Sequence, residues 1–221
     1  MKKLLITTIA TLAMTGVSYA GSFGIGASGS YALVDATGTE TTGAGTNGTA
    51  NTHRDAVEEA AIIGSLFVDF EMDSGITIGF SHVPGAANVS DKTHSRTETA
   101  EGVSGTDATG SVTRTADAEV ENFNTLYVEV PVGSAFIKGG LASIDVNTTE
   151  NKVTDAGSYG NATLDGYTLG LGMNGSMGGM FTKTSVEYTD FETLSLSSTT
   201  NNKITADLDV LEFKIAVGKR F

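Results

Sequence analysis

Two pairs of neighbouring residues, Ser81-His82 and His94-Ser95, are the residue types that nucleophilic catalysis would use. A catalytic serine needs a base within hydrogen-bond reach of its hydroxyl and an acid that orients the base. Consecutive residues of a strand point to opposite faces, so Ser81 and His82 cannot form that pair, and His94-Ser95 has no evident third member. We therefore expect an interfacial or loop histidine at each place, no catalytic residue, and a protein that is not an enzyme.

Three G-x-G-x-x-G matches, which begin at Gly24, Gly43 and Gly170, raise the question of a phosphate-binding loop. None opens a helix inside a βαβ unit, the context that a dinucleotide site requires. The leading glycines of the first and third matches instead lie on strand faces, where small residues leave room for side chains from other strands. The chain has no cysteine and three histidines, and no segment has calcium-loop spacing, so we expect no cofactor and no metal.

The composition favours an exported all-β protein over a nucleic-acid binder. The formal net charge is −13, which is the wrong sign for a nucleic-acid partner. The 28 glycines and the many threonines and serines score poorly in helices. We interpret the polar runs Thr37–Thr52 and Glu98–Thr115 as long surface loops, because they fall between alternating segments.

Alternation of large apolar residues with small or polar ones predicts eight strands with a regular pattern of connections. Short turns are expected at 71–74, 131–134 and 174–179, and long loops near 34–59, 84–117, 147–162 and 192–203. Long connections follow the odd-numbered strands and short connections follow the even-numbered ones, as in a transmembrane barrel with both termini on the side of the short turns. The predicted strands lie at 23–33, 60–70, 75–81, 125–130, 137–142, 167–172, 183–188 and 211–221.

The last eleven residues show the pattern most clearly, because they alternate up to a terminal aromatic. One face carries Leu211, Phe213, Ile215, Val217 and Phe221, and the other carries Glu212, Lys214, Ala216, Gly218 and Arg220. A strand between lipid and a polar lumen needs this alternation, and an open sheet edge in lipid would leave backbone groups unpaired. The predicted fold is therefore all-β, an eight-stranded antiparallel up-and-down transmembrane β-barrel, and a β-sandwich is the structural alternative.

The first twenty residues have the features of a signal peptide. Met1-Lys2-Lys3 supplies positive charge, Leu4–Met14 is a short apolar stretch, and Ser18-Tyr19-Ala20 supplies small residues for cleavage. We expect residues 1–20 to be a signal peptide that is cleaved after Ala20, and residues 21–221 to be the barrel domain.

The terminal strand resembles that of bacterial outer-membrane β-barrels, and the whole mature length resembles the small outer membrane protein A, outer membrane protein X and opacity-like groups. The resemblance implies a monomer in the bacterial outer membrane that contacts outer-membrane lipid and lipopolysaccharide. It also implies an assembly signal for the barrel-assembly machinery. That signal corresponds to Phe213, Ile215, Val217 and Phe221.

Strand parity places a set of charged side chains inside the barrel, where they either pair into a plug or line a narrow water path. The leading functional hypothesis is a non-enzymatic barrel that displays acidic polar loops for envelope integrity or for surface contact and adhesion. The alternative is a small cation-preferring, porin-like channel, and the third hypothesis is a lipid-modifying barrel enzyme that uses His82 or His94. The predicted lumen charges are Glu129, Lys138, Lys183, Glu187, Glu212, Lys214 and Arg220.

Overall fold

The structure, a computed structural model, describes residues 21–41, 52–88, 94–99, 111–150, 159–198 and 202–221. Within these residues no helix is long and apolar enough to cross a membrane. The strands are β1 (Gly21–Thr41), β2 (Thr52–Met72), β3 (Thr77–His82), β4 (Ala86–Asn88), β5 (His94–Thr99), β6 (Ser111–Val132), β7 (Ala135–Glu150), β8 (Ala162–Met177), β9 (Met180–Phe191), β10 (Leu194–Ser197) and β11 (Lys203–Arg220).

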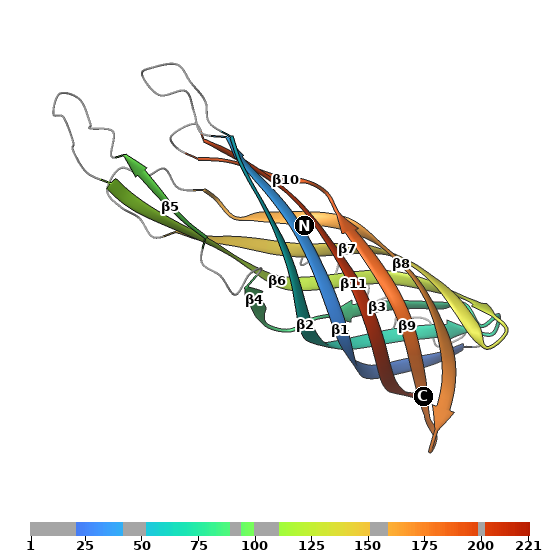
Figure 1. Cartoon of the computed structure of the whole chain (residues 1–221). Helices are drawn as coiled ribbons and strands as arrows, with labels where there is room; N and C mark the ends of the chain where they lie inside the picture. Colours follow the sequence, from blue (N-terminus) through green and yellow to red (C-terminus); the bar gives the residue numbers. More distant parts are fainter. Residues whose placement is uncertain (1–20, 42–51, 89–93, 100–110, 151–158, 199–201) are drawn as a thin grey trace.

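Eight strand positions close into a ring, which confirms the predicted antiparallel barrel (Figure 1). The order around the ring is β1-β2-β3-β6-β7-β8-β9-β11, and β11 pairs again with β1. The short strands β4 and β5 follow β3 along β6, and β10 follows β9 along β11. At the closing seam the Phe221 backbone N–H donates to the Phe23 carbonyl over 2.8 Å, and the Phe23 N–H donates to the Phe221 carbonyl over 3.2 Å.

The strands are longer than the alternation predicted, and the expected loops are correspondingly shorter. The runs Thr37–Thr52 and Glu98–Thr115 were expected to be loops, but β1 continues to Thr41, β2 begins at Thr52, and β6 begins at Ser111. For these described parts of the two runs the prediction was wrong, because threonine is β-branched and fits a strand well. Residues 42–51 and 100–110 of the runs lie outside the described residues. Alternation is also needed only where one face meets lipid, so a strand that continues into water loses its signature.

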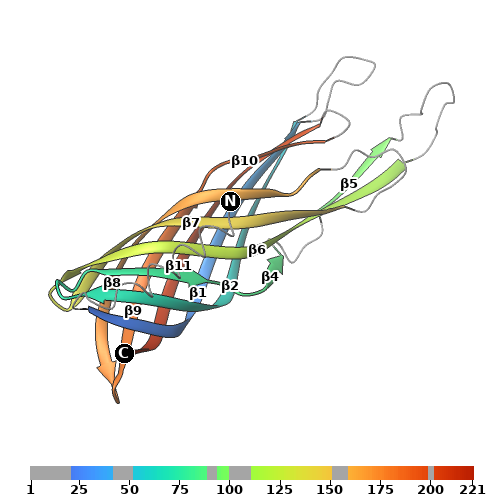
Figure 2. The same cartoon turned by 180° about the vertical axis from the view of Figure 1, so that it is seen from behind.

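The other expected loops are corrected in the same way. The stretch 84–117 contains β4, β5 and the start of β6, while 192–203 contains β10. β7 reaches Glu150 and β8 starts at Ala162, so the connection near 147–162 is shorter than expected. The turn expected at 174–179 narrows to Gly178 and Gly179, whose φ angles of +60° and +82° suit a two-residue hairpin turn. Below, the end with the short turns is called the turn end, and the opposite end is called the loop end (Figure 2).

An apolar belt covers the outer wall of the ring. Side chains at alternate positions of every long strand point outward, and three tyrosines lie at the loop-end border of the belt: Tyr31, Tyr167 and Tyr188. Exposed apolar side chains in a closed ring are what a membrane-spanning barrel presents to lipid. The exposed set includes Phe23, Ile25, Leu33, Ile62, Leu66, Ile78, Leu126, Val128, Val130, Ile137, Leu141, Leu169, Leu171, Met173, Val186, Phe213 and Ile215.

The interior has two layers. The turn-end half is packed with charged, hydroxyl and aromatic side chains, while the loop-end half is an apolar core. We call this core the apolar cap. Its buried members are Ala32, Ala142, Ile144, Val146, Leu164, Phe191, Leu194, Leu208 and Val210.

Candidate functional site

The lumen is built on aromatic rings that lie over glycines of the neighbouring strand. Each pair joins directly opposite residues of adjacent strands, and together the pairs use all eight strand positions. A Cβ atom added to any of these glycines would collide with the ring opposite. The pairs are Phe67 over Gly26, Tyr127 over Gly79, Phe136 over Gly172, and Phe181 over Gly218.

A first cluster of charges lies near the turn end and centres on Lys183 of β9. Its Nζ lies 2.6 Å from Glu129 Oε2 and 3.1 Å from Asp69 Oδ2. Arg220 of β11 binds the other oxygen of Asp69 at 3.2 Å and also binds Glu71 at 2.7 Å. The Asp69 side chain has no exposed surface, so this carboxylate is held between two cations inside the barrel.

A second cluster lies on the loop-end side of the first and centres on Glu187. One oxygen of this carboxylate, Oε2, accepts from Lys138 Nζ at 2.8 Å and from Lys214 Nζ at 3.0 Å. Lys214 also binds Glu212 Oε2 at 3.0 Å. The remaining carboxylate oxygens accept from hydroxyls, Ser185 to Glu187 at 2.8 Å and Ser30 to Glu212 at 2.6 Å. Every carboxylate oxygen in this cluster therefore has a donor, as buried charges require.

The two clusters hold five carboxylates and four cations. Asp69, Glu129, Glu187 and Glu212 face Lys138, Lys183, Lys214 and Arg220, and the fifth carboxylate, Glu71, binds Arg220 with 39% of its side chain exposed. The aromatic rings add to the packing, because Lys138 lies over the Tyr127 ring at 4.2 Å and Arg220 lies over the Phe181 ring at 4.5 Å. The buried charges therefore balance, and the single excess carboxylate is the partly exposed Glu71 at the turn end.

The space that is left between the side chains is small. A cavity of about 30 Å³ lies among residues such as Ser28, Ser81 and Glu187, which is room for about two water molecules. Toward the loop end the apolar cap begins directly. Ala32 is buried opposite Glu212, and Val210 is buried one inward position further along β11. The arrangement can hold isolated waters and neutralise charge, and the apolar cap separates this layer from the loop end.

All seven residues that the sequence placed in the lumen have an oppositely charged partner in these clusters. Sequence reasoning missed Asp69, which joins Lys183 and Arg220 into one network, and Glu71, which binds Arg220. Asp69 continues the inward positions Ser65 and Phe67 of its strand, so the alternation carries a signal for it. That signal is weak because most of this face of the strand is apolar.

The two candidate catalytic neighbours are separated as the alternation requires. His82 Nδ1 lies 2.8 Å from Asn124 Oδ1, whereas the Ser81 hydroxyl lies in the lumen and donates to Ser65 Oγ at 3.2 Å. The His94 and Ser95 side chains lie outside the described residues. No group of three or more His, Cys, Asp or Glu side chains that could hold a metal ion occurs in the described part of the chain.

The residues of the expected assembly signal lie on the outer face of β11. Phe213, Ile215 and Phe221 are 48%, 62% and 71% exposed, and Val217 is half-buried. Their outward direction makes them part of the apolar belt.

An acidic row borders the belt at the loop end. Glu58, Asp35, Asp209 and Asp190 lie directly opposite one another across β2, β1, β11 and β9. On each strand the acidic residue lies on the loop-end side of the outward apolar residues, and the row therefore lies beyond the belt. Burial, and then the neighbouring Asp35 and Asp190 carboxylates, raise the pKa of the Asp209 carboxyl above its usual value. Like charges directly opposite in a sheet destabilise it, so this row costs stability at neutral pH.

A closed antiparallel ring of eight strands, with an apolar outer belt and a filled interior, defines the class as a small transmembrane β-barrel of the outer-membrane type. No protein-family model matches the chain, and no curated protein matches it. Among solved structures, one of Ail, the attachment invasion locus protein of Yersinia pestis, in complex with the heparin analogue sucrose octasulfate, matches 88% of this chain and 97% of its own at 11% identity, with a TM-score of 0.36. Neisserial surface protein A matches over 91% of this chain and 99% of its own at 7% identity, with a TM-score of 0.40.

A protease also matches, the outer membrane protease OmpT of Escherichia coli, over 90% of this chain and 97% of its own at 8% identity, with a TM-score of 0.41. These are likenesses of fold at very low identity. Since a surface protein and a protease share them, they do not distinguish between activities. The fold supports a place in a bacterial outer membrane.

Proposed function

We propose that this protein is a non-enzymatic integral outer-membrane protein whose filled barrel is a rigid support for polar strand extensions that make contacts at the cell surface. The observation that carries the proposal is the contrast between the two parts of the molecule. Inside the belt, the charges are paired and the apolar cap fills the loop-end half of the lumen. Beyond the belt, the strands continue as paired ribbons.

The extensions are long enough to reach well past a lipid headgroup layer. Beyond the belt, strands β1 and β2 remain paired from the level of Asp35 and Glu58 to that of Thr41 and Thr52. Six residues of strand span roughly 20 Å along the chain direction. Strand β11 pairs with β1 up to Lys203, and β5 with the start of β6 forms a second ribbon (Figure 1). Binding sites are often carried by such segments on a rigid scaffold.

The charge of the first ribbon indicates the chemistry of its partner. Two bases, Arg54 and Lys203, stand among many acids, so the ribbon should attract cationic surfaces and repel polyanions. The sulfated ligand in the Ail structure belongs to that protein, and the charge of this chain argues against a similar ligand here. The acids of the ribbon and its base are Asp35, Glu40, Asp55, Glu58, Glu59, Asp190, Glu192, Asp207 and Asp209.

The experiment that tests this proposal compares two folded forms in vesicles. In the first variant, Thr37 and Ala56, which are directly opposite in the sheet, are joined by an Asn-Gly turn, so the end of the ribbon is removed. A second variant, called the three-charge variant, keeps the full length of the ribbon and removes three negative charges through Asp55→Asn, Glu58→Gln and Glu59→Gln. We expect the intact protein to bind a polylysine-coated surface and the three-charge variant to bind weakly. The shortened form loses Glu40 and Asp55 but also loses Arg54. Its loss of binding should therefore be smaller. Binding of the three-charge variant equal to that of the intact protein would contradict the proposal.

The channel hypothesis uses the same lumen residues and is disfavoured by their pairing. A cation path needs unpaired carboxylates along a continuous opening, whereas Glu129 and Glu187 are bound to lysines and the apolar cap follows above them. The enzyme hypothesis lacks a nucleophile and base in contact, because Ser81 and His82 bind different partners.

Three further expectations belong to the proposal. Residues 1–20, which lie outside the described residues, act as a signal peptide cleaved after Ala20. The outward apolar residues of β11 and Phe221 act as the signal for the barrel-assembly machinery. The protein works as a monomer in contact with outer-membrane lipid and lipopolysaccharide. Cleavage is checked by mass spectrometry of the exported protein, and the signal by the loss of assembly in cells when Phe221 is removed.

A further inference from the structure

The outer wall carries a groove within the apolar belt. It has a volume of about 750 Å³ and crosses β7, β8, β9 and β11. Two cross-strand rows of outward side chains form it, in which each residue is directly opposite the next. The first row is Ile137, Leu171, Val186 and Phe213, and the second is Ala135, Met173, Thr184 and Ile215.

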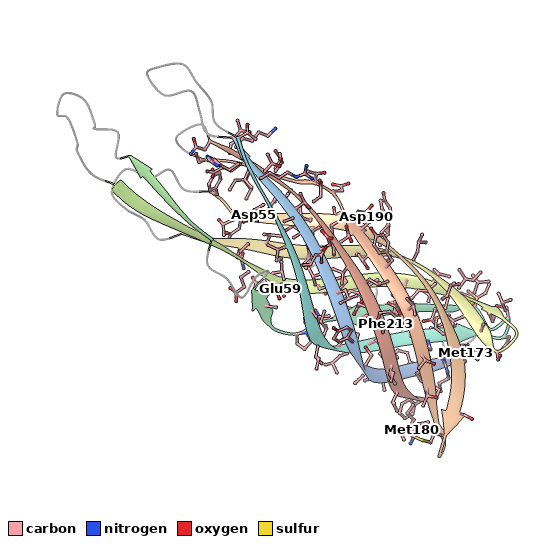
Figure 3. All side chains as sticks on the ribbon, in the orientation of Figure 1. Asp55, Glu59, Met173, Met180, Asp190 and Phe213 are labelled. Carbon is pink, nitrogen blue, oxygen red and sulfur yellow. The ribbon has the colours of Figure 1, made fainter. Side chains whose placement is uncertain are left out.

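The sizes of these side chains explain the depression. Thr184 and Val186 on β9 are small and form the floor, while Leu171 and Met173 on β8 form one wall. Larger side chains on β11, Phe213 and Ile215, form the other wall. Met173 and Phe213 bound the groove on its two sides (Figure 3). The result is an apolar groove that is lowest over β9 and extends across β8 to Ala135 and Ile137 of β7.

A single cation lies at the turn-end side of this groove. Lys219 follows Ile215 and Val217 on the outer face of β11 and is exposed, with its Nζ 5.4 Å from the centre of the Phe221 ring. The other described lysines and arginines of the turn-end half, Lys138, Lys183, Lys214 and Arg220, point into the lumen and are paired. Within the described residues, no carboxylate is paired with Lys219.

We infer that the groove binds one anionic phospholipid of the turn-side leaflet, with an acyl chain along the floor of β9 and the phosphate beside Lys219. This rests on the membrane placement in the proposed function, and it adds a ligand that the placement alone does not supply. An acyl chain is the apolar occupant that the surrounding medium provides, and the outward side chains that line the groove are apolar apart from Thr184. A lysine at the membrane surface attracts an anionic headgroup, which distinguishes this lipid from its neutral neighbours.

The absence of tryptophan from the chain makes the test direct, because one introduced Trp is the only such fluorophore. The variant Leu171→Trp reports from the groove wall, and Leu126→Trp on the outer face of β6 is the matched control. Each variant is refolded into mixed vesicles that contain either brominated phosphatidylglycerol or brominated phosphatidylcholine at the same mole fraction. Quenching is normalised to vesicles of the fully brominated lipid, so that depth in the membrane cancels.

We expect Leu171→Trp to prefer the anionic lipid about fivefold, the effect of one lysine at the membrane surface. Adding Lys219→Gln should abolish this preference, and Leu126→Trp should show none. Equal preference at the two sites, or no effect of Lys219→Gln, would overturn the inference while a heat-shifted gel band shows that the barrel is inserted. Failure to insert would refute the membrane placement as well. Quenching at Leu171→Trp that is weak with both lipids and rises on dilution of the protein would assign the groove to a second copy of the chain.

Discussion

Replacing Lys183 with methionine should destabilise the barrel more than any change to an exposed lysine. The ammonium group lies 2.6 Å from Glu129 and 3.1 Å from Asp69, and only 7% of its side chain is exposed. At an effective dielectric constant of about 20, these contacts are worth about 6 and about 5 kcal/mol before the cost of desolvation. Asp69 keeps Arg220 in the variant, but Glu129 has no other salt bridge among the described residues and stays buried without its partner.

Removing one partner of a buried ion pair costs about 3–5 kcal/mol, so Lys183→Met should lose that much free energy of unfolding. With a urea dependence of about 2 kcal/mol per molar, the unfolding midpoint should fall by about 2 M. The assay is reversible urea unfolding of the protein in vesicles, followed by circular dichroism and by the heat-shifted gel band. Lys203→Met, at an exposed lysine of β11, is the control and should change stability by less than about 0.5 kcal/mol.

A double variant separates charge from packing. Lys183→Met together with Glu129→Gln removes both members of the shorter pair, and it should recover about 1–3 kcal/mol relative to the sum of the single changes. A Lys183→Met protein as stable as Lys203→Met would refute the reasoning, because it would show that the lumen carboxylates are hydrated rather than paired.

Three further predictions concern packing and charge elsewhere in the barrel. Gly172→Ala should cost more than 1 kcal/mol because its Cβ would meet the Phe136 ring, whereas Gly139→Ala, with nothing within 4 Å of the added atom, should be nearly neutral in the same urea assay. Asp209→Asn should stabilise the barrel at pH 7; since the folded state raises the pKa of this carboxyl, the native protein gains stability as pH falls, and the benefit of the substitution should disappear there. Leu164→Ala in the apolar cap should lower the free energy of unfolding by about 2–4 kcal/mol, and a loss below 1 kcal/mol would indicate a hydrated lumen.

Alternation was enough to predict the ring and the inward direction of the charges, because a period of two fixes the face of each residue. Alternation does not predict which charged residues pair across the lumen. Lys183 and Asp69 are 114 positions apart in the chain, and their contact depends on the combined register of the strands between them. No local pattern encodes that register.

The same limit applies to the glycines and to the extensions. The small residues of the lumen could be predicted to make room, but the aromatic that fills each space, such as Phe136 over Gly172, follows from cross-strand pairing. The loop-end parts of β1 and β2, threonine-rich in β1 and charged in β2, carry no strand signal because both of their faces meet water. The sequence also does not predict the acidic row, since Asp35 and Asp209 are distant in sequence and become neighbours only when the barrel closes.

The central claim is that the lumen is closed, and single-channel recording of the folded protein in a planar bilayer tests it most directly. The heat-shifted gel band first confirms that the barrel has formed. We expect no stable conductance steps, and we expect the Glu129→Gln and Glu187→Gln variants to be silent as well when they fold. Steady, cation-selective steps in the native protein that change on neutralising either glutamate would contradict the account and restore the channel hypothesis.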